Sequence, residues 1–182
     1  MRKLLASFTA LFIIVFALTG CTKEPETSNA QTFDTLVTTE QANTDSTYAA
    51  RAYIESLFLN DRALFECCYP SGFLDRLNES AGVDVYETYR SVFVISGTFL
   101  GTSAPDYRIV AVENGFDEGY MRSRIGSVTG TDYSDIGVIK IQKVKVYFQY
   151  DSGVLNTDFY IITYEVNGSW YVLESVNGQW EF

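Results

Sequence analysis

Residues 160–173 read YIITYEVNGSWYVL and carry the clearest local structural pattern in the chain. Asn167-Gly168 is a dipeptide that a two-residue type I′ turn prefers, because both turn positions need a positive φ. Apolar and aromatic residues flank this turn on both sides, as in a β-hairpin. We therefore expect antiparallel strands over residues 158–166 and 169–176. On the second strand, alternation places Trp170 and Val172 on one face and Tyr171 and Leu173 on the other.

Residues 139–150 form the longest expected strand. Its apolar residues occupy odd positions at first and even positions from Val144 onward. Because successive side chains point to opposite faces of a strand, this change of phase predicts a β-bulge near Gln142-Lys143. Further upstream, residues 107–112 are expected to form a short strand, whereas residues 115–131 fit either a short helix or a loop.

The first half of the chain has the spacing of amphipathic helices. Asp45 or Ser46 can cap the first helix, because a short polar side chain accepts a hydrogen bond from the free N–H groups at a helix start. Asp61 can cap a second, short helix that ends at Pro70. The start of a later helix, Asp84-Val85-Tyr86-Glu87, is a capping box. The expected inward residues are Ala50, Tyr53, Ile54, Leu57 and Phe58, then Leu64, Phe65 and Cys68, then Phe73, Leu74 and Leu77 after Ser71, and finally Tyr86, Tyr89, Val92 and Phe93.

Helices followed by long antiparallel strands predict an α+β domain, with N-terminal helices packed on a curved antiparallel sheet. This order resembles the nuclear-transport-factor-2-like superfamily, also called cystatin-like cone folds, over residues 45–176. The resemblance rests on AARAYIE at 49–55, which continues through Asn60-Asp61 to Tyr69-Pro70, and on the closing hairpin. The ending NGSWYV is similar to the last hairpin of the uncharacterised small-lipoprotein type of this fold. The superfamily includes isomerases, dehydratases, binding modules and assembly domains, so the fold alone defines no activity.

The beginning of the chain resembles a bacterial lipoprotein signal with its lipobox. Arg2 and Lys3 precede an apolar run over residues 4–18. Leu18-Thr19-Gly20-Cys21 then matches a Leu, two small residues and a Cys. The run is shorter than the roughly 20 residues of a membrane-spanning helix. The resemblance implies a diacylglycerol on Cys21, cleavage before it, and a lipid anchor in the cell membrane that holds the protein outside the cytoplasm.

Residues 22–44 are polar, and their large apolar residues are limited to Phe33, Leu36 and Val37. Such a composition does not bury enough apolar surface to become ordered. We expect a disordered tether that acts as a spacer and is dispensable for folding. The expected organisation is a signal peptide at 1–20, the lipidated cysteine and tether at 21–44, and a single domain at 45–182.

Charge and composition exclude several classes of function. Removing Arg2 and Lys3 with the signal peptide leaves 11 basic and 23 acidic residues, a net charge of −12. Such acidity repels phosphate backbones, so we expect no nucleic-acid partner. The chain also contains no histidine, which removes the commonest general base, the usual nucleophilic triads and most zinc sites. We therefore expect no metal and no cofactor.

Cys67 and Cys68 are adjacent in the sequence. Neighbouring Cα atoms lie about 3.8 Å apart, which is below the usual range for a disulfide. We expect at least one of the two to be a small core residue. A strained disulfide between them, acting as a redox switch, is the alternative.

Two hypotheses for function follow. The first is a non-enzymatic module that binds a small apolar ligand inside the cone or a protein partner through the outer face of the sheet. The second is an isomerase-like or dehydratase-like enzyme that uses a buried Asp/Tyr pair, for which Asp106 and Asp158 are the candidate carboxylates. Trp170 is expected to anchor the last hairpin, and Trp180 is left undecided. The residues that could line the cone are Tyr89, Phe93, Tyr107, Tyr147, Tyr160 and Tyr164, although the tyrosines also fit ordinary core positions.

Overall fold

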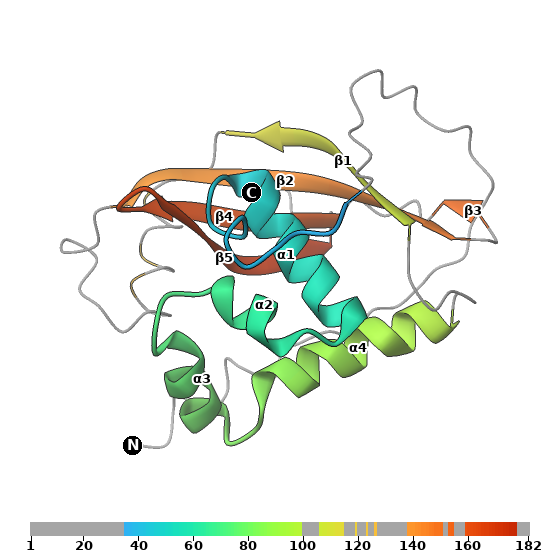
Figure 1. The fold of residues 1–182 in the computed structure, drawn as a ribbon, viewed down its shortest axis with the longest axis horizontal. Helices are drawn as coiled ribbons and strands as arrows, with labels where there is room; N and C mark the ends of the chain where they lie inside the picture. Colours follow the sequence, from blue (N-terminus) through green and yellow to red (C-terminus); the bar gives the residue numbers. More distant parts are fainter. Residues whose placement is uncertain are drawn as a thin grey trace.

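The computed structural model describes residues 35–99, 106–114, 138–150, 153–154 and 159–177, together with positions 119, 123 and 126. Within these residues the fold is α+β. Four helices come first in the chain, and an antiparallel sheet follows. The helices lie on one side of the sheet (Figure 1). The predicted fold class is confirmed at this level.

The expected helix starts are largely confirmed. The side chain of Asp45 accepts a hydrogen bond from Tyr48 N–H at 2.8 Å, and that of Asp61 accepts one from Leu64 N–H at 3.0 Å. Asp84 accepts from the amide of Glu87. The third helix differs, because Gly72 and not Ser71 precedes it. The helices are α1 at Ser46–Leu59, α2 at Arg62–Cys67, α3 at Phe73–Ala81 and α4 at Val85–Phe99.

The sheet has the strand order β1-β2-β4-β5, and β3 pairs with β2. The strands are β1 at Asp106–Glu113, β2 at Val138–Tyr150, β3 at Gly153–Val154, β4 at Phe159–Val166 and β5 at Ser169–Asn177. The turn between β4 and β5 has φ values of 52° at Asn167 and 80° at Gly168. Positive values at both positions are what the type I′ dipeptide predicts.

The bulge predicted near Gln142-Lys143 is wrong in position. Pairing between β2 and β4 is regular from Lys140 to Val146, and the register shifts instead between Val138 and Lys140. Further shifts lie at Val110 in β1, and at Leu173 in β5. The apolar phase change arises because Ile141 lies on the opposite face from Val144, and not because the strand slips between them.

The two faces of the sheet are distinguished by the pairing of β2 with β4. Directly opposite residues of an antiparallel pair point to the same face. Val144 lies opposite Ile161, and both belong to the core that packs against α1; we call this the inner face. Lys145 lies opposite Tyr160 on the other side, the outer face. Trp170 and Val172 share one face, as predicted, and both belong to the core, so Trp170 anchors the hairpin on the inner face.

Helix α1 is buried on nearly all sides. Residues from Ala49 to Leu57 are all buried, including Arg51 and Glu55, which are not among the expected inward residues. The inner face of the sheet covers one side of this helix, and α2 and α4 contact another. Residues 35–44, which we call the strap, cover the polar side (Figure 1).

The expected start of the domain at residue 45 is too late, because the strap packs on the core. Val37 is 6% exposed and Ala42 is fully buried, and both belong to the core cluster. The Asn43 side-chain amide donates to the carbonyls of Cys67 and Trp170 at 2.7 and 2.8 Å. Backbone hydrogen bonds and two small apolar side chains therefore order a segment that is otherwise polar. The earlier part of the expected tether lies outside the described residues.

Candidate functional site

The most unusual group in the described residues is a buried pair of opposite charges on α1. Arg51 and Glu55 are each 4% exposed at the side chain, and Arg51 Nη2 lies 3.0 Å from Glu55 Oε1. Arg51 Nε also donates to the same oxygen at 3.2 Å. Four residues apart on a helix, the two side chains are neighbours on one face. Charged groups are almost never buried unless they are paired in this way.

Tyr107 reaches this pair from β1. Its hydroxyl donates to Glu55 Oε1 and accepts from Arg51 Nε at 3.3 Å. Burial raises the pKa of the Tyr107 phenol well above its ordinary value, and the hydrogen bond to the Glu55 carboxylate raises that pKa further. Tyr107 is therefore a protonated donor at neutral pH. A carboxylate beside a tyrosine hydroxyl is the combination that the enzyme hypothesis requires, and it is formed by Glu55 where Asp106 or Asp158 was expected.

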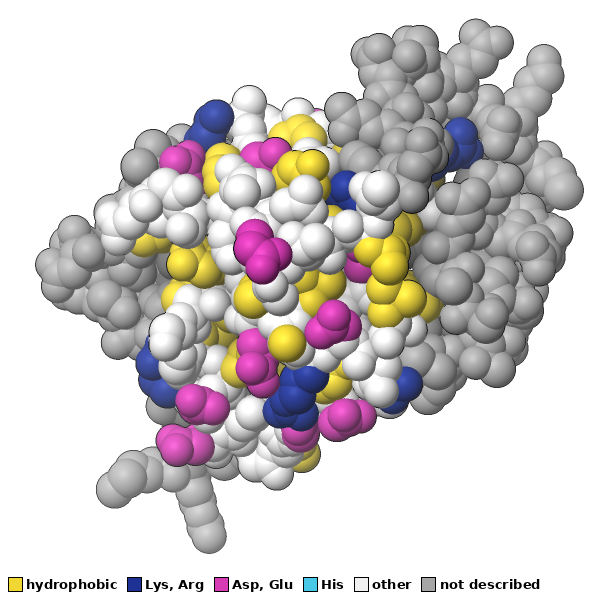
Figure 2. Space-filling view, viewed as in Figure 1, with side chains coloured by type: hydrophobic (Ala, Val, Ile, Leu, Met, Phe, Trp, Pro, Cys, Tyr) yellow, Lys and Arg dark blue, Asp and Glu magenta, His cyan; other side chains and the backbone are white. Residues whose placement is uncertain are grey.

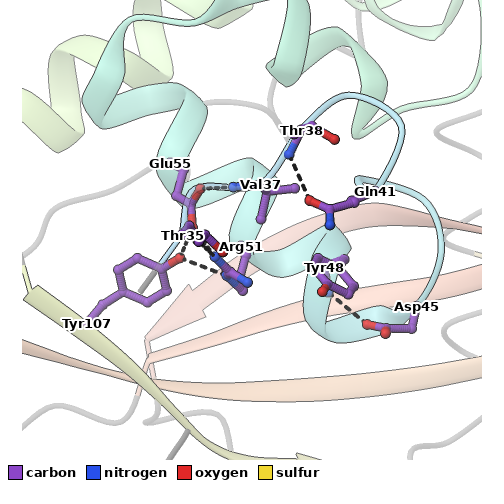
Figure 3. A network of polar contacts seen from close by, with 9 residues as sticks. All are labelled: Thr35, Val37, Thr38, Gln41, Asp45, Tyr48, Arg51, Glu55 and Tyr107. Atoms are coloured by element: carbon purple, nitrogen blue, oxygen red, sulfur yellow. Dashed lines mark hydrogen bonds and ion pairs between the residues drawn. The ribbon is translucent and has the colours of Figure 1, made fainter. Parts of the chain in front are cut away.

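The strap completes the group, as Figure 3 shows. The backbone N–H of Val37 donates to Glu55 Oε2 at 2.6 Å, and Arg51 Nη2 donates to the carbonyl oxygen of Thr35. Glu55 thus accepts hydrogen bonds at both oxygens, from Arg51, Tyr107 and Val37. We call Arg51, Glu55 and Tyr107 the polar triad. Its geometry is that of a neutralised, hydrogen-bonded structural group that is closed by the chain itself.

The predicted cone-lining residues are divided between the two faces of the sheet. Tyr107 reaches α1 on the inner side, and Tyr89 on α4 packs against the core, with its ring 6.3 Å from that of Phe65. The other three described tyrosines lie on the outer face. These are Tyr147 opposite Arg108, Tyr160 opposite Lys145, and Tyr164 opposite Tyr171. The side chain of Phe93 is outside the described residues. The five described residues therefore do not gather in one site.

Other predicted positions also fall outside the description. Cys21 and the whole signal segment, Asp158, Trp180 and the side chain of Asp106 are among them. The sequence reasoning missed Arg51 and Glu55. Their spacing of four residues is the one available indication, but the same spacing is common in exposed helical ion pairs.

Cys68 is fully buried and Cys67 is partly buried, and both thiols are free. The expectation of at least one core cysteine is confirmed. Burial raises the pKa of each thiol, so neither has the lowered pKa of a reactive cysteine. Their backbone carbonyls have a structural role instead, because Cys67 accepts from Asn43 and Cys68 accepts from Val172 N–H at 2.8 Å. These contacts join the end of α2 to the strap and to β5.

The outer face carries lysines beside aromatic rings. Lys143 Nζ lies 4.3 Å from the ring centroid of Tyr160 and 3.0 Å from Glu113 Oε2. Lys145 Nζ lies 5.5 Å from the Tyr147 ring and 5.6 Å from the Tyr160 ring. Acidic side chains balance these lysines, since Glu113 and Glu174 share their face. This face is therefore mixed in charge and rich in tyrosine, but it is covered at Ile162 and Tyr164, which are each 2% exposed.

The view in Figure 2 shows the side on which α1 lies. Hydrophobic side chains form separate groups there, and acidic side chains are spread among them. The large exposed hydrophobic residues of the described part are Leu36, Leu59, Val83 and Val112. Within the described ranges, no helix is long and apolar enough to cross a membrane. The same residues contain no group of three Cys, Asp or Glu side chains that could hold a metal ion.

Comparison of the chain with protein-family models, with curated proteins and with solved structures found no match.

Proposed function

We propose that the protein is a membrane-anchored lipoprotein that works outside the cytoplasm as a non-enzymatic binding module. The proposed anchor is a diacylglycerol on Cys21. It is supported by the resemblance of Leu18-Thr19-Gly20-Cys21 to a lipobox. Each acyl CH₂ that enters the bilayer contributes about 0.8 kcal/mol, and stable anchoring takes more than one chain. Two chains on one cysteine meet that requirement.

The ordered strap shortens the proposed spacer. Residues 22–34, thirteen in number, separate Cys21 from Thr35. If they behave as a coil, their root-mean-square span is about 20 Å. The domain would then work close to the membrane surface. Its proposed fold is the cone of the nuclear-transport-factor-2-like type, which is supported by the helices on one side of an antiparallel sheet.

The saturation of Glu55 is the observation that favours binding over catalysis. A general base needs a carboxylate that can reach a substrate and take its proton. Both oxygens of Glu55 already accept from Arg51, Tyr107 and the strap. The alternative, an isomerase-like or dehydratase-like enzyme, is supported by the closeness of Glu55 and Tyr107. It additionally requires the strap and Arg51 to leave the carboxylate.

A protein partner is better supported than a small apolar ligand. On the inner side of the sheet, Ile54 and Leu57 of α1 share a core with Val144 and Ile161, all with no exposed surface. The described part of this side is thus occupied by the protein's own side chains. On the outer face, Tyr160 and its lysine neighbours combine an apolar body with polar tips, a composition suited to a protein interface. We propose the half-buried part of the outer face, formed by Lys143, Lys145, Tyr147 and Tyr160, as the partner surface.

The test places a photo-crosslinking amino acid at position 143 in cells that carry the anchored protein. The matched control position is Glu79, which is exposed on α3. A discrete protein adduct from position 143, absent from position 79 and identified by mass spectrometry, supports the proposal. The Cys21→Ser variant should leave the membrane fraction, or remain an uncleaved precursor, and should lose the adduct. A cleaved Cys21→Ser protein that still fractionates with membranes would refute the lipid anchor, and equal adducts from both positions would refute the outer face as the partner surface.

A further inference from the structure

The strap contacts the rest of the domain at both of its ends: residues 35–37 lie over the polar triad, and residues 39–43 form turns that lead to α1. Val37 is buried, whereas its neighbours Leu36 and Thr38 are exposed. Thr35 and Thr39, two positions to either side, are exposed as well, so Val37 is the one side chain that residues 35–39 bury. Leu36 is 62% exposed and Val37 is 6% exposed, so the domain buries the valine side chain and leaves the neighbouring leucine in solvent.

Two members of the polar triad, Arg51 and Glu55, bind the backbone of this segment. Glu55 accepts the N–H of Val37, and Arg51 donates to the carbonyl of Thr35. Recognition of main-chain groups supplies affinity for a peptide of any sequence, and a pocket for an alternate side chain supplies specificity. Val37 combines main-chain recognition with a side-chain pocket, because its N–H donates to Glu55 and its side chain lies in the core cluster.

The second half of the strap is fixed to the edge of the sheet. Asn43 accepts Trp170 N–H at 3.0 Å through its backbone carbonyl. Its side-chain amide donates to the carbonyl of the same residue. Both main-chain groups of Trp170 are thus paired by one residue of the strap. β5 is an edge strand of the sheet, and this pairing covers its first residues. Natural proteins commonly protect an exposed edge strand by covering it in this way.

We propose that the strap is a peptide ligand bound in cis, and that the site beneath it accepts an extended peptide with a small branched apolar side chain. This site is separate from the lipid anchor and from the outer face of the sheet. The strap competes strongly because it is covalently attached, which gives it an effective concentration in the millimolar range. The site is therefore closed until the strap is weakened or drawn away.

The experiment uses the full chain. Val37→Asp places a carboxylate where the site is apolar and should dislodge the strap. Leu36→Asp is the matched control, because Leu36 is exposed. The probe is a fluorescent synthetic peptide of residues 33–45, and its binding is followed by fluorescence anisotropy. We expect the V37D protein to bind the probe at least tenfold more tightly than the L36D protein does.

A second substitution and a hydrogen-exchange measurement complete the test. Adding Glu55→Gln to V37D should weaken probe binding at least tenfold in a protein that keeps its protection at Val172 N–H, since the amide no longer offers the same acceptor to the peptide backbone. Hydrogen exchange should show that V37D loses protection in the strap but keeps it at Val172 N–H, which donates to Cys68. If the strap is released and the probe does not bind, the site is not a peptide site. If the strap stays protected, or if V37D and the milder Val37→Ala both lose protection at Val172, then the strap is an integral part of the core. Each of these results overturns the proposal.

Discussion

Removing one member of the buried Arg51–Glu55 pair should be far more damaging than removing both. The two side chains are each 4% exposed and approach to 3.0 Å. Glu55→Leu leaves the Arg51 guanidinium without its carboxylate in a place where water does not reach it. Arg51→Met leaves the Glu55 carboxylate in the same position. The double variant leaves neither charge behind.

The magnitude follows from charge and burial. At an effective dielectric constant of about 20, two unit charges 3 Å apart attract by about 5.5 kcal/mol, and the desolvation of two ions offsets most of that gain. Breaking a buried pair therefore costs about 3–5 kcal/mol, because the remaining charge keeps its desolvation penalty and loses its partner. The double variant should cost only about 2–4 kcal/mol, for the lost hydrogen bonds to the strap and to Tyr107. Additive behaviour would instead give about 6–10 kcal/mol.

The assay is urea unfolding of the wild-type, single-variant and double-variant proteins, followed by circular dichroism and by tryptophan fluorescence. Coincident transitions establish a common two-state process, from which the coupling free energy is obtained. In thermal melts, a single variant should lose roughly 6–20 °C, at about 2–4 °C per kcal/mol for a domain of this size. The reasoning would be refuted if the free energy of unfolding of the Glu55→Leu protein lay within about 1 kcal/mol of the wild-type value. Strictly additive single variants would refute it as well.

Val37→Ala should destabilise the domain by about 1–2.5 kcal/mol, since it removes buried methyl groups, whereas Leu36→Ala should have an effect within about 0.5 kcal/mol; equal effects in urea unfolding would contradict the packing of the strap. Gly168→Val should cost about 1–3 kcal/mol because φ is +80° there, although an added Cβ meets no atom within 4 Å; a neutral result would mean that the backbone strain is absent. Because burial raises the pKa of several tyrosines, their stabilising effect should be complete below the unfolded pKa of about 10 and should be lost as pH rises above it. A phenolate absorbance titration should show these groups ionising only on unfolding, and ionisation near pH 10 in the folded protein would contradict their burial. The tyrosines concerned are Tyr53, Tyr69, Tyr107 and Tyr164.

The parts of the fold that sequence reasoning predicted well depend on local physics. The Asn167-Gly168 turn follows from the positive φ values that few other residues accept, and the caps at Asp45 and Asp61 follow from hydrogen bonds three residues along the chain. The bulge was misplaced because a phase change in apolar residues has two explanations. Either the strand slips, or an apolar residue such as Ile141 lies on the outer face. Only the cross-strand register distinguishes them.

The strap and the polar triad could not be predicted, because each depends on the other across long separations in the chain. Arg51 and Glu55 alone resemble an exposed helical ion pair, and the strap alone has too little apolar surface to become ordered. Tyr107 is 52 residues from Glu55, and Val37 is 18 residues away on the other side. Burying the charged pair requires donors and acceptors from the strap, and ordering the strap requires a buried pair that recognises its backbone. Counting apolar residues in the sequence therefore predicts neither an ordered strap nor a buried charged pair. The same mutual dependence explains how a polar segment becomes part of the domain, and why a change at Glu55 should be detected first in the protection of the strap.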